Sequence, residues 1–233
     1  MSVIVLIPAA GTGSRMKAAV NKQYLMLVDR PVLARTIDLF EHHPRIDSIF
    51  VITPQAEIQF CRQEVVERFG FRKVRELIPG GAQRQDSVRN GIRACGAGPD
   101  DVILIHDGAR PLLAPTAIDE IIDMVGETGA ALVGVPAKDT LKEVVDGKVR
   151  MTPARDLYWQ AQTPQAFRYS TIREAHEMAL ADGFRGTDDA MLVERLGKPV
   201  AMVMGSYRNI KITTPEDLAL ATALLVGSQG GEE

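Results

Sequence analysis

Short runs of β-branched and aliphatic residues alternate with longer amphipathic segments through most of the chain. The short runs predict strands at Val3–Ile7, Ser48–Thr53, Val74–Ile78, Val102–His106, Ala130–Val135 and Val200–Met204. The amphipathic segments predict helices at Val32–Glu41, Glu57–Arg68, Arg84–Ala94, Thr116–Gly126, Thr171–Ala181, Asp188–Leu196 and Pro215–Val226. Because this alternation is typical of βαβ units, it predicts an α/β fold with a Rossmann-like, mainly parallel sheet and helices on both faces.

One segment interrupts the alternation. Residues 139–152 hold two short strand-like runs on either side of Asp146-Gly147. Asp-Gly between such runs is a strong indication of a β-hairpin. Since a two-stranded ribbon is only marginally stable alone in water, we expect this protruding ribbon to pack on the body of the fold or on another subunit.

The last predicted helix has a clear beginning. Thr214 is suited to cap it, Pro215 to its first position, and Glu216 and Asp217 to the positive end of its dipole. The residues after it, 227–233, are polar and rich in glycine, and they are predicted to form a flexible tail. Because a single core can serve a chain of up to ~250 residues, residues 1–226 are predicted to form one domain.

The charge balance limits the class of ligand. A formal net charge of −3 gives no general attraction to nucleic acid, so we expect a small anionic ligand that local cations and backbone amides hold. No run approaches the ~18 apolar residues of a membrane span, and no basic leader precedes Val3, so we expect a cytoplasmic protein without a membrane partner. Cys61 and Cys95 lack metal-ligand spacing and are predicted to be reduced and buried.

The loop after the first strand is the first candidate site. Gly11 and Gly13 let backbone amides approach an anion, and Arg15, Lys17 and Lys22 add positive charge. The spacing matches neither the dinucleotide fingerprint, because Met16 stands where its third glycine or alanine belongs, nor the P-loop. A tight strand-to-helix connection with solvated cations remains the alternative.

A second candidate follows the predicted strand that ends at His106. Asp107 is suited to contact Mg²⁺ or a ribose, and Arg110 to bind an anion with two hydrogen bonds. An Asx-turn at Asp107 and a structural salt bridge at Arg110 are the alternatives. His106 is more consistent with a packed residue at the end of a strand than with a catalytic base.

Other polar positions form two weaker groups. After the third predicted strand, a glycine turn leads into a helix that contains Ser87. Free amides in this turn could contact a nucleotide base, and the alternative is an ordinary turn and helix cap without a ligand. Hydroxyls and cations without a Cys/His or Ser/His pairing suit phosphate binding better than covalent catalysis. The scattered group consists of Lys138, Thr140, Arg155, Thr163-Pro-Gln165, Thr187-Asp-Asp189 and Lys211.

Taken in order, these motifs resemble the 2-C-methyl-D-erythritol 4-phosphate cytidylyltransferase family of the non-mevalonate isoprenoid pathway. The opening loop alone would indicate only the wider nucleotidyltransferase superfamily. The matching segments are Pro8-Ala-Ala-Gly-Thr-Gly-Ser-Arg-Met16, Lys22-Gln-Tyr24, Gly80-Gly81 with Arg84 and Asp86-Ser-Val88, His106-Asp-Gly-Ala-Arg-Pro111, Asp139-Thr140, Thr163-Pro-Gln165, Thr187-Asp188 and Asn209-Ile-Lys-Ile-Thr213. The family often has alanine where Gly108 stands, which keeps the turn small.

The resemblance implies transfer of CMP from CTP to methylerythritol phosphate with release of pyrophosphate. It implies that Arg15, Lys22, Arg155 and Lys211 are catalytic, and that Asp107 helps to hold Mg²⁺ or another divalent cation. It implies CTP contacts at Ala10, Gly11, Thr12, Gly13, Gly81, Ser87, Asp107 and Gly108. It implies acceptor contacts at Arg110, Thr140, Arg155, Thr187 and Lys211. The ribbon at residues 139–152 would clasp a second subunit in a homodimer, so Arg155 would serve its own or the neighbouring site.

The implied chemistry agrees with the residue types. A phosphate nucleophile is already ionised at neutral pH and needs no general base, so positioning and charge neutralisation suffice. Two alternatives stay open. One is a cytidylyltransferase for ribitol 5-phosphate or another polyol phosphate, and the other is a non-catalytic nucleotide-binding protein.

Overall fold

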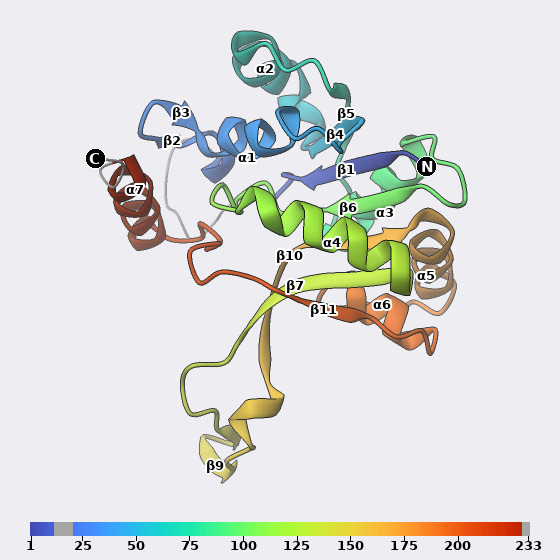
Figure 1. Cartoon of the computed structure of the whole chain (residues 1–233), viewed down its shortest axis with the longest axis vertical. Coiled ribbons are helices and arrows are strands. Elements are labelled where there is room, and N and C mark those ends of the chain that lie inside the picture. Colours follow the sequence, from blue (N-terminus) through green and yellow to red (C-terminus); the bar gives the residue numbers. More distant parts are fainter. Residues whose placement is uncertain (12–20, 230–233) are drawn as a thin grey trace.

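The computed structural model describes residues 1–11 and 21–229. Its centre is a seven-stranded sheet of order β11-β7-β10-β6-β1-β4-β5, in which β10 alone runs antiparallel to its two neighbours (Figure 1). The strands are β1 (Val3–Pro8), β4 (Ser48–Thr53), β5 (Val74–Pro79), β6 (Val102–Ile105), β7 (Ala130–Pro136), β10 (Trp159–Arg168) and β11 (Ala201–Met204). The predicted mainly parallel sheet is thereby confirmed.

The helices cover both faces of the sheet, as the alternation predicted. They are α1 (Val32–Glu41), α2 (Ile58–Cys61), α3 (Arg84–Ala94), α4 (Pro115–Thr128), α5 (Tyr169–Ala181), α6 (Ala190–Arg195) and α7 (Pro215–Gln229). Val5 and Ile7 of β1 pack with α1, α2 and α4, whereas Ile4 and Leu6 pack with α3, α5 and α6. Because successive side chains of a strand point to opposite faces, β1 contributes to a hydrophobic core on each side.

Strand β10 was not predicted, because it contains Pro164 and several polar residues. Proline within a run argues against a central strand, since it cannot donate to the ladder. Here the β10–β7 register shifts between Ala161 and Gln165, and the Thr163–Pro164 peptide bond is cis. Thr163 and Gln165 are buried at the centre of the sheet.

Three other segments differ from their predicted form. The helix predicted at Glu57–Arg68 consists of a 3₁₀ turn η3 (Gln55–Glu57), α2 and a π-helical segment η4 (Arg62–Glu67). Helix α7 continues through Gln229, so the first residues of the predicted tail are helical. A short hairpin of β2 (Met26–Leu27) and β3 (Arg30–Pro31) precedes α1.

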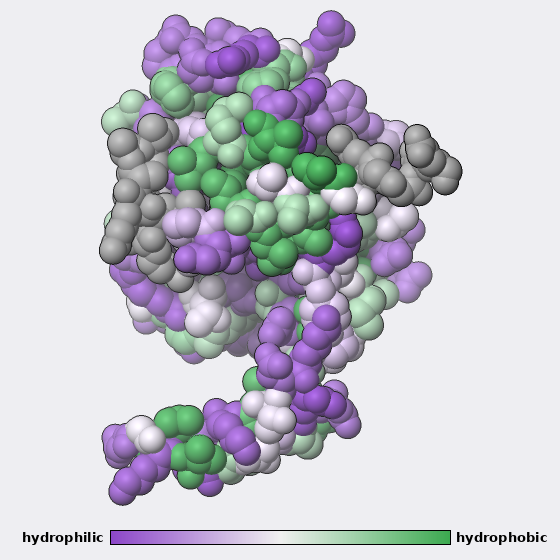
Figure 2. Space-filling model, turned by 90° about the vertical axis from the view of Figure 1, so that its left-hand side faces the viewer, coloured by the Kyte–Doolittle hydropathy of each residue, from purple (hydrophilic) through white to green (hydrophobic). Residues whose placement is uncertain are grey.

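The predicted ribbon is a β-hairpin, with β8 (Glu143–Val145) paired antiparallel to β9 (Lys148–Met151). Asp146 and Gly147 both have positive φ, of 50° and 74°, as a two-residue turn between twisted strands requires. We call residues 139–152 the arm, and it projects away from the sheet (Figure 1). Figure 2 shows hydrophobic residues on its surface, where Val144, Val145, Val149 and Met151 are exposed.

Two remaining expectations can be compared with the structure. Cys61 and Cys95 are buried free thiols, as predicted, and burial raises the pKa of Cys61 to about 11. Within the described part of the chain, no helix has both the length and the apolar character needed to cross a lipid bilayer.

Candidate functional site

A cavity of about 350 Å³ lies where the carboxyl ends of β1, β5 and β6 meet. This edge is where open α/β sheets bind ligands. The cavity walls are Pro8–Gly11 after β1, Gly81–Arg84 and Ser87 after β5, Asp107–Ala109 after β6, and the side chains of Lys22, Gln23 and Lys211. The structure thus brings together the predicted CTP-binding positions Ala10, Gly11, Gly81, Ser87, Asp107 and Gly108. Thr12, Gly13 and Arg15 lie outside the described residues.

The glycines of the β5 turn are required by close packing. A Cβ atom on Gly80 would lie 2.5 Å from Cβ of Ala10, and one on Gly81 would lie 2.4 Å from Cβ of Asp86. A larger residue at Gly80 would therefore push the β5 turn away from the loop after β1, and one at Gly81 would push the turn away from the start of α3. At Gly108 a Cβ atom would lie 3.1 Å from Cβ of Ala9, which leaves little room for an added methyl group.

Ser87 shapes the turn from inside the first turn of α3. Its Oγ accepts a hydrogen bond from the Gly81 amide at 3.0 Å and donates to the Gln83 carbonyl at 3.1 Å. A capping box between Gln83 and Asp86 also fixes the start of this helix. Ser87 therefore stabilises the turn and also lines the cavity, and contact with a nucleotide base at this position stays a prediction.

Asp107 is surrounded by three cationic side chains that are distant from one another in the sequence. Its Oδ2 lies 2.8 Å from Nζ of Lys211 and 3.6 Å from Nε of Arg110, and its Oδ1 lies 3.3 Å from Nε of Arg84. Burial by itself raises the pKa of Asp107, but the charges of Arg84 and Lys211 outweigh burial and hold this pKa well below its usual range. The carboxylate therefore stays ionised and fixes the three cations.

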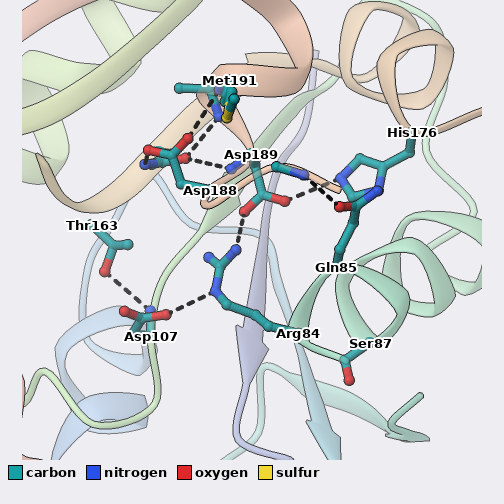
Figure 3. Close-up of polar contacts among 12 residues, drawn as sticks. Arg84, Gln85, Ser87, Asp107, Thr163, His176, Asp188, Asp189 and Met191 are labelled. Atoms are coloured by element: carbon teal, nitrogen blue, oxygen red, sulfur yellow. Dashed lines mark hydrogen bonds and ion pairs between the residues drawn. The ribbon is translucent and has the colours of Figure 1, made fainter. Parts of the chain in front are cut away.

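Arg84 extends this ion pairing into the interior. Its Nη1 lies 2.8 Å from Oδ2 of Asp189, and Oδ1 of Asp189 lies 3.1 Å from Nε2 of His176 (Figure 3). Asp189 and His176 are each only 1% exposed. A continuous polar chain thus runs from the buried His176 to the cavity wall at Asp107.

A second cavity of about 250 Å³ adjoins the first. Its walls include Arg110, Thr163, Gln165 and Thr187, and it shares Arg84, Asp107 and Lys211 with the first cavity. Of the predicted acceptor-binding residues, the structure places Arg110, Thr187 and Lys211 here. Thr140 and Arg155 line neither cavity, because Thr140 belongs to the arm and Arg155 lies just beyond it, where its Nη1 donates to the Lys138 carbonyl at 2.8 Å.

Arg110 is more constrained than its position in the sequence suggested. Its Nη1 donates to the Asn209 carbonyl at 2.7 Å, and its side chain is 12% exposed. Burial lowers the pKa of Arg110, partly offset by the charge of Asp107. The structural salt bridge that the sequence left open is thereby present, next to the second cavity.

His106 is not placed to act as a base. It is completely buried, its Nε2 lies 2.9 Å from the Arg110 carbonyl, and its Nδ1 lies 3.1 Å from Oγ1 of Thr163. Burial lowers the pKa of His106 to about 4. The prediction of a packed strand-end residue agrees with this environment.

The described residues do not form a protein-held metal cage. Among them, no group of three or more His, Cys, Asp and Glu side chains is placed to hold a metal ion, and Asp107 is the single carboxylate on the wall of the first cavity. Both oxygens of Asp107 already face cations. The predicted role of Asp107 in helping to hold Mg²⁺ or another divalent cation stays a prediction.

From the sequence, Arg84 and His176 had no predicted role in the site, and Gln165 and Asp189 stood only in the scattered group of polar positions suited to phosphate binding. Arg84 and Asp189 did appear within motifs, but nothing in the sequence showed that they form an ion pair across 105 positions. Lys22, by contrast, was predicted and does line the first cavity, where its Nζ donates to the Ile212 carbonyl at 3.3 Å.

Comparison with known proteins agrees with this geometry. The family model for 2-C-methyl-D-erythritol 4-phosphate cytidylyltransferase matches residues 3–227. Relatives with that name from Syntrophotalea carbinolica and Geobacter metallireducens are 63% and 58% identical, over 97% of this chain and 97% and 98% of theirs.

Solved structures lead to the same family. The 4-diphosphocytidyl-2C-methyl-D-erythritol synthase from Anaerococcus prevotii is 31% identical with a TM-score of 0.84, over 97% of this chain and 96% of its own. The 2-C-methyl-D-erythritol 4-phosphate cytidylyltransferase from Thermus thermophilus is 32% identical with a TM-score of 0.80, over 97% of this chain and 100% of its own. With the site geometry and the similarity spanning almost the whole sequence, this chain belongs to the 2-C-methyl-D-erythritol 4-phosphate cytidylyltransferase family.

Proposed function

We propose that this protein transfers CMP from CTP to 2-C-methyl-D-erythritol 4-phosphate, which gives 4-diphosphocytidyl-2-C-methyl-D-erythritol and pyrophosphate. A phosphate oxygen of the acceptor attacks the α-phosphorus of CTP in line with the departing pyrophosphate. The observation that carries the proposal is the wall of Arg84, Asp107 and Lys211 that two adjoining cavities share. A nucleotide in the first cavity and a phosphorylated alcohol in the second would meet at this cationic wall.

The reaction needs charge neutralisation more than proton transfer. The attacking phosphate is already ionised, so the reaction needs no general base. His106, which is buried and has a pKa of about 4, is therefore not required as one. Lys22 and Lys211 both line the first cavity and would stabilise the negative charge that grows on the α-phosphate and on pyrophosphate. We propose the same role for Arg15.

We propose that Mg²⁺ or another divalent cation enters as a complex with CTP. Magnesium is commonly bound through substrate phosphates, with few protein ligands and several waters. The cations around Asp107 support this proposal, because they would repel a metal ion whose positive charge is not already offset by the triphosphate.

We propose a homodimer in which the arm reaches the neighbouring subunit. The exposed apolar residues Val144, Val145, Val149 and Met151 on a thin hairpin support this assembly, because such a hairpin is marginally stable without a partner surface. Thr140 and Arg155 would then complete the second cavity of the partner. We further propose the cytoplasm, which holds the CTP pool, as the location.

The test is a pyrophosphate-release assay of the purified protein with CTP, Mg²⁺ and one acceptor at a time. We expect turnover with 2-C-methyl-D-erythritol 4-phosphate and only slow turnover with ribitol 5-phosphate. Preferential turnover of ribitol 5-phosphate would reassign the acceptor. Calorimetric CTP binding without pyrophosphate release from any acceptor would indicate a nucleotide-binding protein and refute the transferase.

A further inference from the structure

Asp189 lies directly behind the shared wall of the two cavities without lining either of them. Its side chain is 1% exposed, and both of its oxygens are engaged, by Arg84 at 2.8 Å and by His176 at 3.1 Å. A buried carboxylate is costly unless it is paired and hydrogen-bonded. Neither contact takes a direct part in the proposed transfer of CMP.

The backbone around Asp189 is held as firmly as its side chain. Oε1 of Gln165, in β10, accepts hydrogen bonds from the amides of Asp189 at 3.1 Å and Ala190 at 3.0 Å. Nε2 of the same side chain donates to Oδ2 of Asp188 at 2.8 Å, and Oδ1 of Asp188 accepts from the Met191 amide (Figure 3). The start of α6 is therefore fixed to the centre of the sheet.

His176 completes the support from α5. Its Nδ1 is buried without a hydrogen-bond partner among the described residues, whereas its Nε2 faces Asp189. Nε2 donates its proton to Asp189, because a carboxylate oxygen is an acceptor, whereas a proton on Nδ1 would be buried without one. This leaves Oδ2 of Asp189 for Arg84.

Arg84 is consequently held in one orientation, because its guanidinium group donates to two carboxylates. Nη1 binds Asp189, and Nε faces Asp107 at 3.3 Å. The planar guanidinium makes the two contacts interdependent, because its donors are fixed relative to one another. Turning Arg84 away from Asp189 would also move it out of contact with Asp107, on the wall of both cavities.

We propose that Asp189 is a positioning residue of the transferase, which acts through Arg84 on the shared wall, and that His176 holds Asp189 in place. The inference rests on the proposed function and adds a supporting layer to it. Three cationic side chains, Arg84, Arg110 and Lys211, face the two carboxylates Asp107 and Asp189. On the shared wall itself, Arg84 and Lys211 face the single carboxylate Asp107, so this wall has an excess of positive charge toward polyanionic substrates, and Asp189 fixes where Arg84 lies.

Two effects of removing the Asp189 charge have opposite signs, which makes the proposal testable. If Asp189 contributed only its charge, Asp189→Asn would make the site more positive and would tighten CTP binding. If it positions Arg84, the same variant would displace the wall and weaken catalysis. We expect the second result, with kcat/KM lowered about 10- to 100-fold, as for small misplacements of groups that contact substrate.

The experiment compares wild type, Asp189→Asn, Arg84→Lys and the double variant in the pyrophosphate-release assay. Asp182→Asn is the matched control, because Asp182 pairs with Arg195 at 2.9 Å on the exposed surface. If Asp189 acts through Arg84, the double variant should be no worse than Arg84→Lys alone. Independent, multiplying losses, or a kcat/KM for Asp189→Asn within twofold of wild type, would overturn the inference.

Two further measurements keep the test decisive. Should Asp189→Asn fail to fold, two variants of His176 test the same support: His176→Leu removes the hydrogen-bond donor to Asp189, and His176→Gln restores one. We expect a severalfold loss of kcat for His176→Leu and recovery for His176→Gln. Equal activity of the two variants would count against the inference. Calorimetric CTP affinity of the same variants needs no acceptor. If wild type itself shows no turnover, the proposed function fails. Weaker CTP binding by Asp189→Asn than by wild type would still support the positioning role of Asp189. Unchanged or tighter CTP binding would refute that role.

Discussion

Nζ of Lys211 lies 2.8 Å from Oδ2 of Asp107, although 103 residues separate them in the chain. The ion pair joins the loop after β6 to the segment after β11, and both residues line both cavities. An amine held in this way is already oriented toward the place where the substrates would meet. Preorganised cations of this kind act most strongly in the transition state, because they need no rearrangement during the reaction.

Replacing Lys211 with alanine should therefore lower kcat by roughly 10²–10³, as for removal of one well-placed electrostatic group. Asp107 would keep Arg84 and Arg110, so thermal unfolding should change little. Steady-state kinetics and calorimetric melting check the two expectations. Lys198→Ala is the control, since Lys198 pairs with Glu174 on the surface, and an equal loss of activity there would contradict a specific role for Lys211.

Lys22→Ala and Arg15→Ala should each lower kcat far more than they alter folding. Lys22 lines the first cavity from a polar segment rather than from the hydrophobic core, and Arg15 is assigned by resemblance to the family. The measurements are kcat with saturating CTP and the midpoint of thermal unfolding. Arg68→Ala removes an exposed helical ion pair with Glu64 and serves as the comparison. Loss of the melting transition, in place of activity, would show that these residues are structural.

His106 makes folding stability depend on pH. Its pKa is about 4 in the folded protein, below the value of ~6.5 of an unfolded chain, because burial disfavours the charged ring. Between these values the unfolded state binds more protons, so this contribution is complete above pH ~6.5 and is lost as the pH falls toward 4. The loss should amount to about 3 kcal/mol at most.

Urea unfolding from pH 4 to 7.5 checks this dependence, with His106→Gln as the test variant. Glutamine keeps a donor toward the Arg110 carbonyl but does not titrate. The stability difference between wild type and variant should shrink as the solution is acidified. His42→Asn, which changes an exposed histidine, is the control. A constant difference across the range would exclude His106 as the source.

The arm permits a test of which subunit supplies Arg155. If Arg155 completes the site of the partner, mixing Arg155→Ala with Lys22→Ala, each nearly inactive at subsaturating acceptor, should restore about a quarter of wild-type activity after subunit exchange, since half of the dimers would carry one intact site. If each subunit uses its own Arg155, every site in the mixture keeps a defect and activity stays low. Arg155→Ala alone should raise KM for the acceptor more than KM for CTP.

The association itself depends on the exposed apolar residues of the hairpin. Val149→Asp should lower the molar mass measured by light scattering from that of a dimer to that of a monomer, because a charge in an apolar interface is costly to bury. Lys148→Asp, on the polar part of the same hairpin, is the matched control. A dimer that survives Val149→Asp would show that the arm is not the main interface.

The sequence by itself determined the features that depend on neighbouring residues. Alternating apolar runs predicted most strands and helices, Asp146-Gly147 predicted the hairpin, and Thr214 with Pro215 predicted the start of α7, where Thr214 Oγ1 accepts from the Asp217 amide at 3.4 Å. Each is decided by local backbone preference or by the period of burial. The motifs also indicated the family, because their residues and their order along the chain can be read without knowing which of them are in contact.

Only the tertiary structure decided the insertion of β10 and the pairing within the site. Pro164 and the polar residues of β10 conceal a central strand, because their buried groups are satisfied by segments distant in sequence, such as the start of α6. In the same way Asp107 meets Arg84 and Lys211, and Asp189 becomes a buried support with His176. Such contacts depend on which strand ends share one edge of the sheet, and no local pattern in the sequence encodes that arrangement.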